Sequence, residues 1–278
     1  MKYLVITLGT LLLSLSLITS CAKKGGIQEV QATATPKKIK VLLLWCDVTS
    51  SLKDLESEEV SSIASAVLDH FPQGTKYVLY PIQTETGRPV PIIKSGPTME
   101  DLPTNDDTDD KSHSNVERAT LIKNEITRLY KENKVKHPND RRTCILNTLD
   151  VSAIFLSQFD DRYDPELVFV SDMIEDCRNT PLHKNVQLDK QLFSETIKLV
   201  DAFTSPPDLS RLRITIIVPT AKDTSTVPAG QRPDPRDLER FWQTVFVKCH
   251  FSRDNLSNKE RFYWSPEGLP ERFLAMQQ

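Results

Sequence analysis

Four short apolar runs, separated by segments with helical spacing, constrain the fold of this chain more than any other feature. The runs cover residues 41–46, 77–82, 166–171 and 213–218. Each run has the length of a strand and is apolar at most positions, which is typical of a strand buried on both faces. Strands that alternate with helices predict an α/β fold, namely a doubly wound, mostly parallel, Rossmann-like sheet with helices on both faces.

Apolar residues at steps of three and four positions predict the helices between the runs. We expect helices at about 60–71, 115–132, 145–158, 190–203 and 235–246, and short edge strands at 90–93 and 262–264. The last helix has Asp234 at its N-cap and Pro235 at its first position, where both residue types are favoured. Residues 94–114 are acidic but lack the ligand spacing and turn glycine of an EF-hand, so they predict a solvated loop.

The size and charge of the chain exclude several classes of protein. Its 278 residues are enough for one large domain or two small ones. The balance of 35 Lys and Arg against 38 Asp and Glu argues against a dedicated nucleic-acid binder, so we expect no nucleic-acid partner. No glycine lies between Gly96 and Gly230, which excludes a glycine-rich phosphate loop from the middle of the chain.

The N-terminus predicts export. Residues 3–18 form an apolar stretch that fits a secretory signal better than a membrane-spanning helix. The stretch ends in LITSC, residues 17–21, which resembles the lipobox of bacterial lipoproteins. The alternative is a simple cleaved signal in which Cys21 plays no part.

The lipobox resemblance implies how the mature chain is held in the cell envelope. It implies a signal peptide at residues 1–20 and a lipid anchor on Cys21, which attaches the protein to a membrane. Residues 21–38 lack apolar periodicity and are expected to form a flexible tether. Ala22 after the cysteine implies a place at the outer membrane, facing the periplasm or the surface.

Oxygen-bearing side chains follow two of the apolar runs. Asp47, Thr49, Ser50 and Ser51 come after the first run, and Asp172 comes after the third. In open α/β sheets, ligands bind beyond the carboxyl ends of the strands where the strand order reverses. Hard divalent cations prefer carboxylate and hydroxyl ligands, so this edge of the sheet is a candidate cation site without His or Cys.

These residues resemble the metal-ion-dependent adhesion site of the von Willebrand factor A-type domain family. Asp47-x-Thr49-x-Ser51 matches the first element of that site, with Thr in place of the first Ser. Thr143 begins a segment that resembles the family's Thr-x-Ile-x-x-x-Leu element, and Asp172 matches the Asp that follows the fourth strand. The resemblance implies a von Willebrand A-like domain over residues 39–278.

The resemblance also implies a function. Thr49 and Ser51 would bind Mg²⁺, or Mn²⁺ or Ca²⁺, directly, and the other three residues would bind it directly or through water. One position would stay open for a carboxylate of a partner protein. The expected function is therefore adhesion or protein binding by an envelope-anchored lipoprotein that is not an enzyme.

Two alternatives to this function stay open. The family often has glycines before the Thr and after the last Asp, whereas this chain has Arg141-Arg142 and Met173, which favours a structural lipoprotein with a degenerate metal site. A metal-dependent hydrolase is less favoured, because no Gly-x-Ser-x-Gly elbow occurs. Glu175 and Asp176 either add negative charge around the metal or begin a polar loop.

The cysteines beyond the anchor are Cys46, Cys144, Cys177 and Cys249, none in a CxxC pair. Spacing alone does not determine their pairing, and buried free thiols are an equal alternative. The family resemblance places Cys144 beside Thr143 and Cys177 in the loop that begins at Asp172. An oxidising compartment would then allow a disulfide between Cys144 and Cys177.

Overall fold

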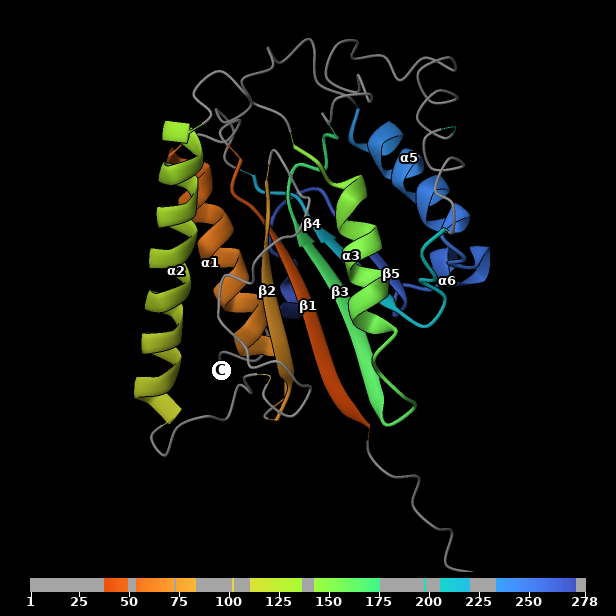
Figure 1. The fold of residues 1–278 in the computed structure, drawn as a ribbon, viewed down its shortest axis with the longest axis horizontal. Helices are drawn as coiled ribbons and strands as arrows, with labels where there is room; N and C mark the ends of the chain where they lie inside the picture. The colour runs from red at the N-terminus through yellow and green to blue at the C-terminus, as the bar shows by residue number, and fades with distance from the viewer. Residues whose placement is uncertain are drawn as a thin grey trace, which may run out of the picture. The chain divides into compact units, whose positions relative to one another are not determined.

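The core of the protein is a five-stranded sheet in which every pairing is parallel (Figure 1). The computed structural model describes residues 38–49, 54–72, 74–83, 102, 111–136, 143–175, 198, 206–220 and 234–273. Within these residues the strands are β1 (Ile39–Asp47), β2 (Lys76–Ile82), β3 (Tyr163–Val170), β4 (Arg213–Ile217) and β5 (Phe262–Ser265). All of them lie in the unit Lys37–Gln278.

The strand order is β2-β1-β3-β4-β5, so the chain moves to one side of β1 with β2 and to the other side with β3. The order of the strands therefore reverses at β1 and β3, which pair with Cys46 opposite Val170 near their carboxyl ends. A reversal of this kind opens a crevice at the sheet edge. The doubly wound α/β fold predicted from the sequence is confirmed.

Helices cover both faces of the sheet (Figure 1). Within the described residues they are α1 (Asp54–His70), α2 (Lys111–Lys136), α3 (Leu146–Leu156), α5 (Pro235–Lys248) and α6 (Arg253–Ser257), with a short 3₁₀ turn, η2 (Glu271–Phe273). Side chains of a strand alternate between faces. In β1, Leu42 and Leu44 pack with the core under α1 and α2, whereas Leu43 and Trp45 pack with the core under α3 and α5.

Two buried tryptophans fix helices to the sheet and its loops. The indole Nε1 of Trp45 in β1 donates to Ser152 Oγ of α3 at 2.9 Å. The indole Nε1 of Trp242 in α5 donates to the carbonyl oxygen of Met173, in the loop after β3, at 2.8 Å. These bonds satisfy the polar atoms of large buried rings, and they hold α3 and α5 in place beside the loop that follows β3.

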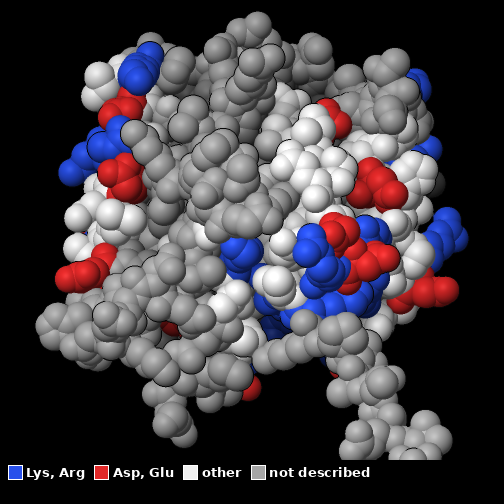
Figure 2. Space-filling model, turned by 60° about the horizontal axis from the view of Figure 1, so that its bottom comes forward, with Lys and Arg blue, Asp and Glu red and all other residues white. Residues whose placement is uncertain are grey.

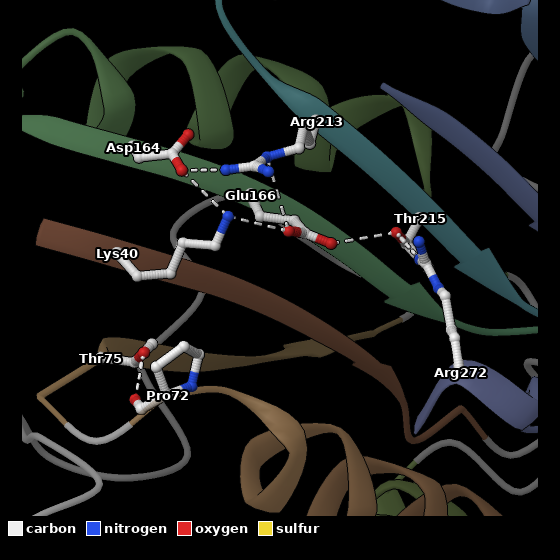
Figure 3. Close-up of polar contacts among 8 residues, drawn as sticks. All are labelled: Lys40, Pro72, Thr75, Asp164, Glu166, Arg213, Thr215 and Arg272. Atoms are coloured by element: carbon white, nitrogen blue, oxygen red, sulfur yellow. Dashed lines mark hydrogen bonds and ion pairs between the residues drawn. The ribbon is translucent and has the colours of Figure 1, made fainter. Parts of the chain in front are cut away.

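Charged side chains gather at the opposite edge, where the strands begin. Figure 2 brings that edge forward and shows basic and acidic side chains interleaved there. Figure 3 shows Lys40 of β1 between two carboxylates of β3, with Nζ at 3.1 Å from Asp164 Oδ2 and 3.4 Å from Glu166 Oε2. Arg213 of β4 pairs with the same two carboxylates. The network links the first residues of three neighbouring strands.

The C-terminal turn η2 completes this network. Arg272 donates to Thr215 Oγ1 at 2.7 Å (Figure 3), and its guanidinium lies 4.3 Å from the ring centre of Tyr263. Phe273 beside it is buried against the ring of His70 at the end of α1, with ring centres 4.7 Å apart. The turn therefore closes the amino-terminal edge of the sheet.

Several helix boundaries differ from the sequence prediction. α1 begins at Asp54 and α2 at Lys111, whereas the predicted starts were residues 60 and 115. α2 therefore takes its first residues from the segment 94–114 that was predicted to be a loop, and that part of the prediction is wrong. The first turn of α2 has no apolar residue and that of α1 has a single one, Leu55, so apolar spacing could not mark them.

Other predicted elements are confirmed or fall outside the described residues. The predicted edge strand at 262–264 is confirmed as β5, which pairs in parallel with β4. Residues 90–93, and 190–203 apart from Lys198, lie outside the described residues, as do the signal peptide, Cys21 and the tether. Among the helices that the structure describes, none has both the length and the apolar character needed to cross a bilayer.

Candidate metal-ion site

The candidate site lies at the carboxyl ends of β1 and β3. β1 ends at Asp47, and β3 ends at Val170, one residue before Ser171. Because the two strands are neighbours, Asp47 lies against the loop that follows β3. This is also the point where the strand order reverses, the place where open α/β sheets bind ligands.

Asp47 is a fully buried carboxylate with three hydrogen-bond donors around it. Its Oδ1 accepts from the backbone N–H of Thr49 at 3.0 Å and from Thr49 Oγ1 at 2.7 Å. Its Oδ2 accepts from Ser171 Oγ at 3.0 Å. Burial raises the pKa of Asp47 above its usual value, although the bonds from Thr49 and Ser171 oppose this rise.

The hydroxyl of Thr143 completes the buried part of the site. Thr143 lies three residues before α3 and is 3% exposed. Its Oγ1 is 3.2 Å from Oγ1 of Thr49, and because the single hydroxyl proton of Thr49 points to Asp47, Thr143 is the donor. Three predicted ligands, Asp47, Thr49 and Thr143, are therefore joined by direct contacts.

The two other predicted ligands are Asp172 and Ser51. Asp172 is half-buried and follows Ser171, whose hydroxyl contacts Asp47. Its Oδ1 accepts from the backbone N–H of Ile174 at 2.9 Å, which fixes the turn after β3. Ser51 lies outside the described residues, so its place in the site stays a prediction.

Glu175 has a role that the sequence analysis did not foresee. Its side chain is fully buried, and its Oε2 accepts from the backbone N–H groups of Ile145 at 2.6 Å and Leu146 at 2.7 Å. These amides begin α3, where N–H groups lack partners within the helix and favour a negative charge. Glu175 therefore caps α3 and joins the loop after β3 to the segment that carries Thr143.

Met173 occupies the position where the resembled family often has glycine. Its φ is 60°, in the left-handed region that glycine favours. Its side chain is fully buried in the core under α3 and α5. The backbone conformation suited to glycine is thus kept, and the larger side chain points into the core rather than to solvent. Arg141 and Arg142 lie outside the described residues.

The cysteines near the site fall into two groups. Cys144, next to Thr143, is disulfide-bonded. Cys46 and Cys249 are buried free thiols, and burial raises the pKa of Cys249 to about 12. Cys177 lies outside the described residues, so the pairing of Cys144 with Cys177 stays a prediction.

The donor set of the site suits a hard cation. Across the ranges that the structure describes, no three or more His, Cys, Asp or Glu side chains converge as a metal-holding group. The candidate site contains two such residues, Asp47 and Asp172, and its other predicted donors are hydroxyls. Oxygen donors of this kind fit Mg²⁺, Mn²⁺ or Ca²⁺ and not a thiolate or imidazole metal such as zinc.

Comparison of the sequence with models of protein families and with curated proteins gave no match. Among solved structures, the chain is similar to a von Willebrand factor type A protein from Catenulispora acidiphila, with 8% identity, a TM-score of 0.41, and coverage of 75% of this chain and 37% of that chain. It is also similar to proximal thread matrix protein 1 from the mussel byssus, with 10% identity, a TM-score of 0.43, and coverage of 87% and 46%.

A further similar structure is the manganese-loaded TRAP protein of Plasmodium vivax, with 10% identity, a TM-score of 0.42, and coverage of 86% of this chain and 72% of that chain. The chain spans less than half the length of the first two structures. The matches include the family that the sequence resembles. Likeness at this level carries no argument about function, and the doubly wound fold rests on the strand order of the chain itself.

Proposed function

We propose that this protein binds a partner protein through a divalent cation at the carboxyl edge of its sheet. Asp47, Thr49, Ser51, Thr143 and Asp172 would hold Mg²⁺, or Mn²⁺ or Ca²⁺. The observation that carries the proposal is the buried carboxylate of Asp47 beside the paired hydroxyls of Thr49 and Thr143. A bound cation would supply the positive charge that a buried carboxylate otherwise lacks.

The residues of the site would divide this task. The hydroxyl oxygens of Thr49 and Thr143 are uncharged ligands, so they would coordinate a cation without cancelling its charge. Ser171 and the backbone N–H of Thr49 orient the Asp47 carboxylate from both oxygens. The cation, when bound, would attract a carboxylate of the partner, and such charge complementarity gives specificity and orientation.

We further propose that the protein is not an enzyme. The hydroxyls of Thr49 and Ser171 both donate to Asp47, which is buried. Asp47 could act as a base for either hydroxyl, but Thr49 and Ser171 are both fully buried, whereas a nucleophile needs an open approach for its substrate. Binding accounts for a buried, rigid arrangement of oxygen atoms better than nucleophilic chemistry does.

A second candidate is a structural role with a degenerate metal site. One observation favours it: both oxygens of Asp47 already accept hydrogen bonds from within the protein. When both carboxylate oxygens already have hydrogen-bond partners, a bound cation adds less stabilisation to the site. Cation titration separates the two candidate functions, because a degenerate site would not bind the cation.

The proposed location is the bacterial cell envelope, with Cys21 as the lipid anchor at the outer membrane. The tether would join the domain at the amino end of β1, and Asp47 is the last residue of β1. The nine residues of β1 rise about 3.3 Å each, so the cation site would lie at the edge opposite the attachment point.

Calorimetric titration of the mature chain with Mg²⁺ and Mn²⁺ tests the cation site. We expect Asp47→Asn and Asp172→Asn to abolish binding while circular dichroism shows an intact fold. Asp160→Asn is the matched control, because Asp160 is an exposed carboxylate before β3, away from the site. Unchanged cation affinity in both site variants, or no binding by the unaltered chain, would overturn the cation site.

Two further experiments test the partner and the anchor. A pull-down from envelope extract should recover a partner that is lost when a chelator is added and when Asp47 is replaced by Asn.

Cys21→Ser should abolish lipid labelling and release the protein from membranes. Membrane fractionation with retained label in this variant would contradict the anchor.

A further inference from the structure

A second candidate site lies at the other end of α3. A cavity of about 640 Å³ opens between α3, the start of β3 and residues 206–212. Leu156, Phe159, Pro207 and Leu212 form apolar walls of the cavity. The volume falls within the range of known ligand sites, about 300–1,000 Å³, in which apolar walls usually surround a few polar groups.

Asp150 of α3 is the polar group that distinguishes this cavity. It lines the cavity and is partly buried. Among the described residues its carboxylate takes part in no hydrogen bond and no ion pair, unlike Asp160, Asp161 and Asp164 nearby in sequence. Burial raises the pKa of Asp150, and no neighbouring cation opposes this rise. The cavity therefore contains a carboxylate that lacks a positive partner.

The other charged groups of the cavity leave this imbalance in place. Arg211 also lines the cavity, but its Nη2 lies 2.7 Å from Asp161 Oδ1 and its Nη1 donates to the carbonyl oxygen of Phe159. Asp208 accepts from the backbone N–H of Ser210 at 2.9 Å. Arg211 is thus already paired, and the cavity favours a ligand with a positive charge.

The cavity is open to solvent along α3. Ile154 lines the cavity and is 66% exposed, so the apolar lining of the cavity reaches the solvent-facing side of α3. Ile154 and Asp150 are four positions apart on α3, so their side chains lie on the same face of the helix. An open apolar lining beside an unpaired carboxylate is complementary to a protein segment that presents an apolar and a basic side chain together.

We propose that this cavity binds a segment of a partner protein in which a lysine or arginine lies beside an apolar side chain. The basic group pairs with Asp150, and the apolar side chain packs on Ile154, Ala153 and Pro206, which line the cavity and keep exposed surface. The site is separate from the cation site, since it lies at the start of β3 and not at its end. The cavity binds a positively charged group of its partner, whereas the cation site would attract a negatively charged carboxylate.

Selection from a random peptide display library tests this proposal. The mature chain is presented with a chelator present, so that the cation site cannot contribute to binding. We expect enriched peptides to carry Lys or Arg next to Leu, Ile, Phe or Trp. We expect Asp150→Asn to lose the enrichment of the basic residue and Ile154→Ser to lose that of the apolar neighbour. Asp160→Asn is the charge-matched control and should select the same peptides as the unaltered chain.

A titration with the most enriched peptide makes the result quantitative. Asp150→Asn should weaken its binding about tenfold, as expected for loss of a charge-assisted hydrogen bond. The same peptide with norleucine in place of the basic residue should bind the two proteins equally. No enrichment of basic residues, or equal enrichment on Asp150→Asn, would overturn the proposal, and it would do so whether or not the cation site binds metal.

Discussion

The hydroxyl oxygens of Thr49 and Thr143 lie 3.2 Å apart, although 94 residues separate them in the chain. The contact joins the end of β1 to the segment that begins α3. Both side chains are almost fully buried, so two neutral oxygen donors are held beside the carboxylate of Asp47 before any ligand arrives. Donors fixed in this way lower the ordering cost of binding a cation.

Replacing Thr143 by Val tests whether this hydroxyl is a cation ligand. Val has nearly the shape of Thr but lacks the oxygen, so we expect affinity for Mn²⁺ to fall at least about tenfold, by the loss of a bond to a charged group. Thr143→Ser keeps the oxygen and should bind within a few-fold of the unaltered chain. Calorimetric titration measures both. Equal affinity for Val and Ser variants would remove Thr143 from the site.

Replacing Glu175 tests the link between the loop after β3 and α3. Glu175→Ala leaves the amides of Ile145 and Leu146 without their buried acceptor, so we expect the free energy of unfolding to fall by about 3 kcal/mol. Glu175→Gln keeps one neutral acceptor oxygen and should cost about half as much. Urea unfolding measures both variants, with Glu267→Ala, an exposed position after β5, as control. A loss below about 1 kcal/mol in Glu175→Ala would contradict the capping role.

The sequence predicted the parts of the site whose contacts are local or belong to a known pattern. Asp47 and Thr49 are two residues apart and directly follow an apolar run, so their proximity followed from the end of a strand. Thr143 and Asp172 came from the family resemblance. Ser171 and Glu175 were missed because their partners lie 124 and 30 residues away, and a single Ser or Glu in a loop forms no periodic pattern.

The fold was predictable for a related reason. A parallel strand buried on both faces must be apolar at nearly every position, and β1 is fully buried from Val41 to Asp47. Helix starts were less predictable, because the first turns of α1 and α2 contain too few apolar residues to show a periodic pattern. The sequence also could not predict the unpaired carboxylate of Asp150, since residues 206–212, which line the same cavity, are far from it in the chain.

Met173 allows a test of two opposing backbone and packing effects. Its left-handed φ of 60° costs about 1–2 kcal/mol for a residue with a side chain, whereas its burial contributes more, since Met→Ala in a core costs about 2–5 kcal/mol. We therefore expect both Met173→Gly and Met173→Ala to destabilise the protein. Met173→Gly should be the more stable of the two by about 1 kcal/mol, because glycine relieves the strain. Urea unfolding with Ala more stable than Gly would contradict this account.

The predicted disulfide between Cys144 and Cys177 can be tested by peptide mapping. Protein exported to the periplasm and digested without reductant should give one linked peptide that contains both cysteines. A bridge of this kind stabilises a fold by about 2–4 kcal/mol, so Cys177→Ser should unfold at a lower urea concentration. Cys249→Ser changes a buried free thiol and should leave the linked peptide intact. Recovery of the two peptides unlinked would rule out the pairing.

The ring of His70 predicts a pH dependence of stability. His70 ends α1 and lies against Phe273, and its Nδ1 is buried without a hydrogen-bond partner. Burial, and then repulsion from Arg272, lowers the pKa of His70 below 6.5. The unfolded chain therefore takes up a proton more readily than the folded protein. The contribution of His70 to stability is complete above pH 6.5 and is lost as the pH falls through the lowered pKa.

Replacing His70 by Phe keeps an aromatic ring against Phe273 and removes the titrating group. We expect the free energy of unfolding of the unaltered protein to fall more steeply than that of His70→Phe between pH 7.5 and about 5, where unperturbed histidine takes up its proton. Urea unfolding of both proteins across this range measures the difference. All other titrating groups are common to the two proteins, so the change in their difference reports on His70 alone. Parallel curves would show that His70 titrates equally in the folded and unfolded states.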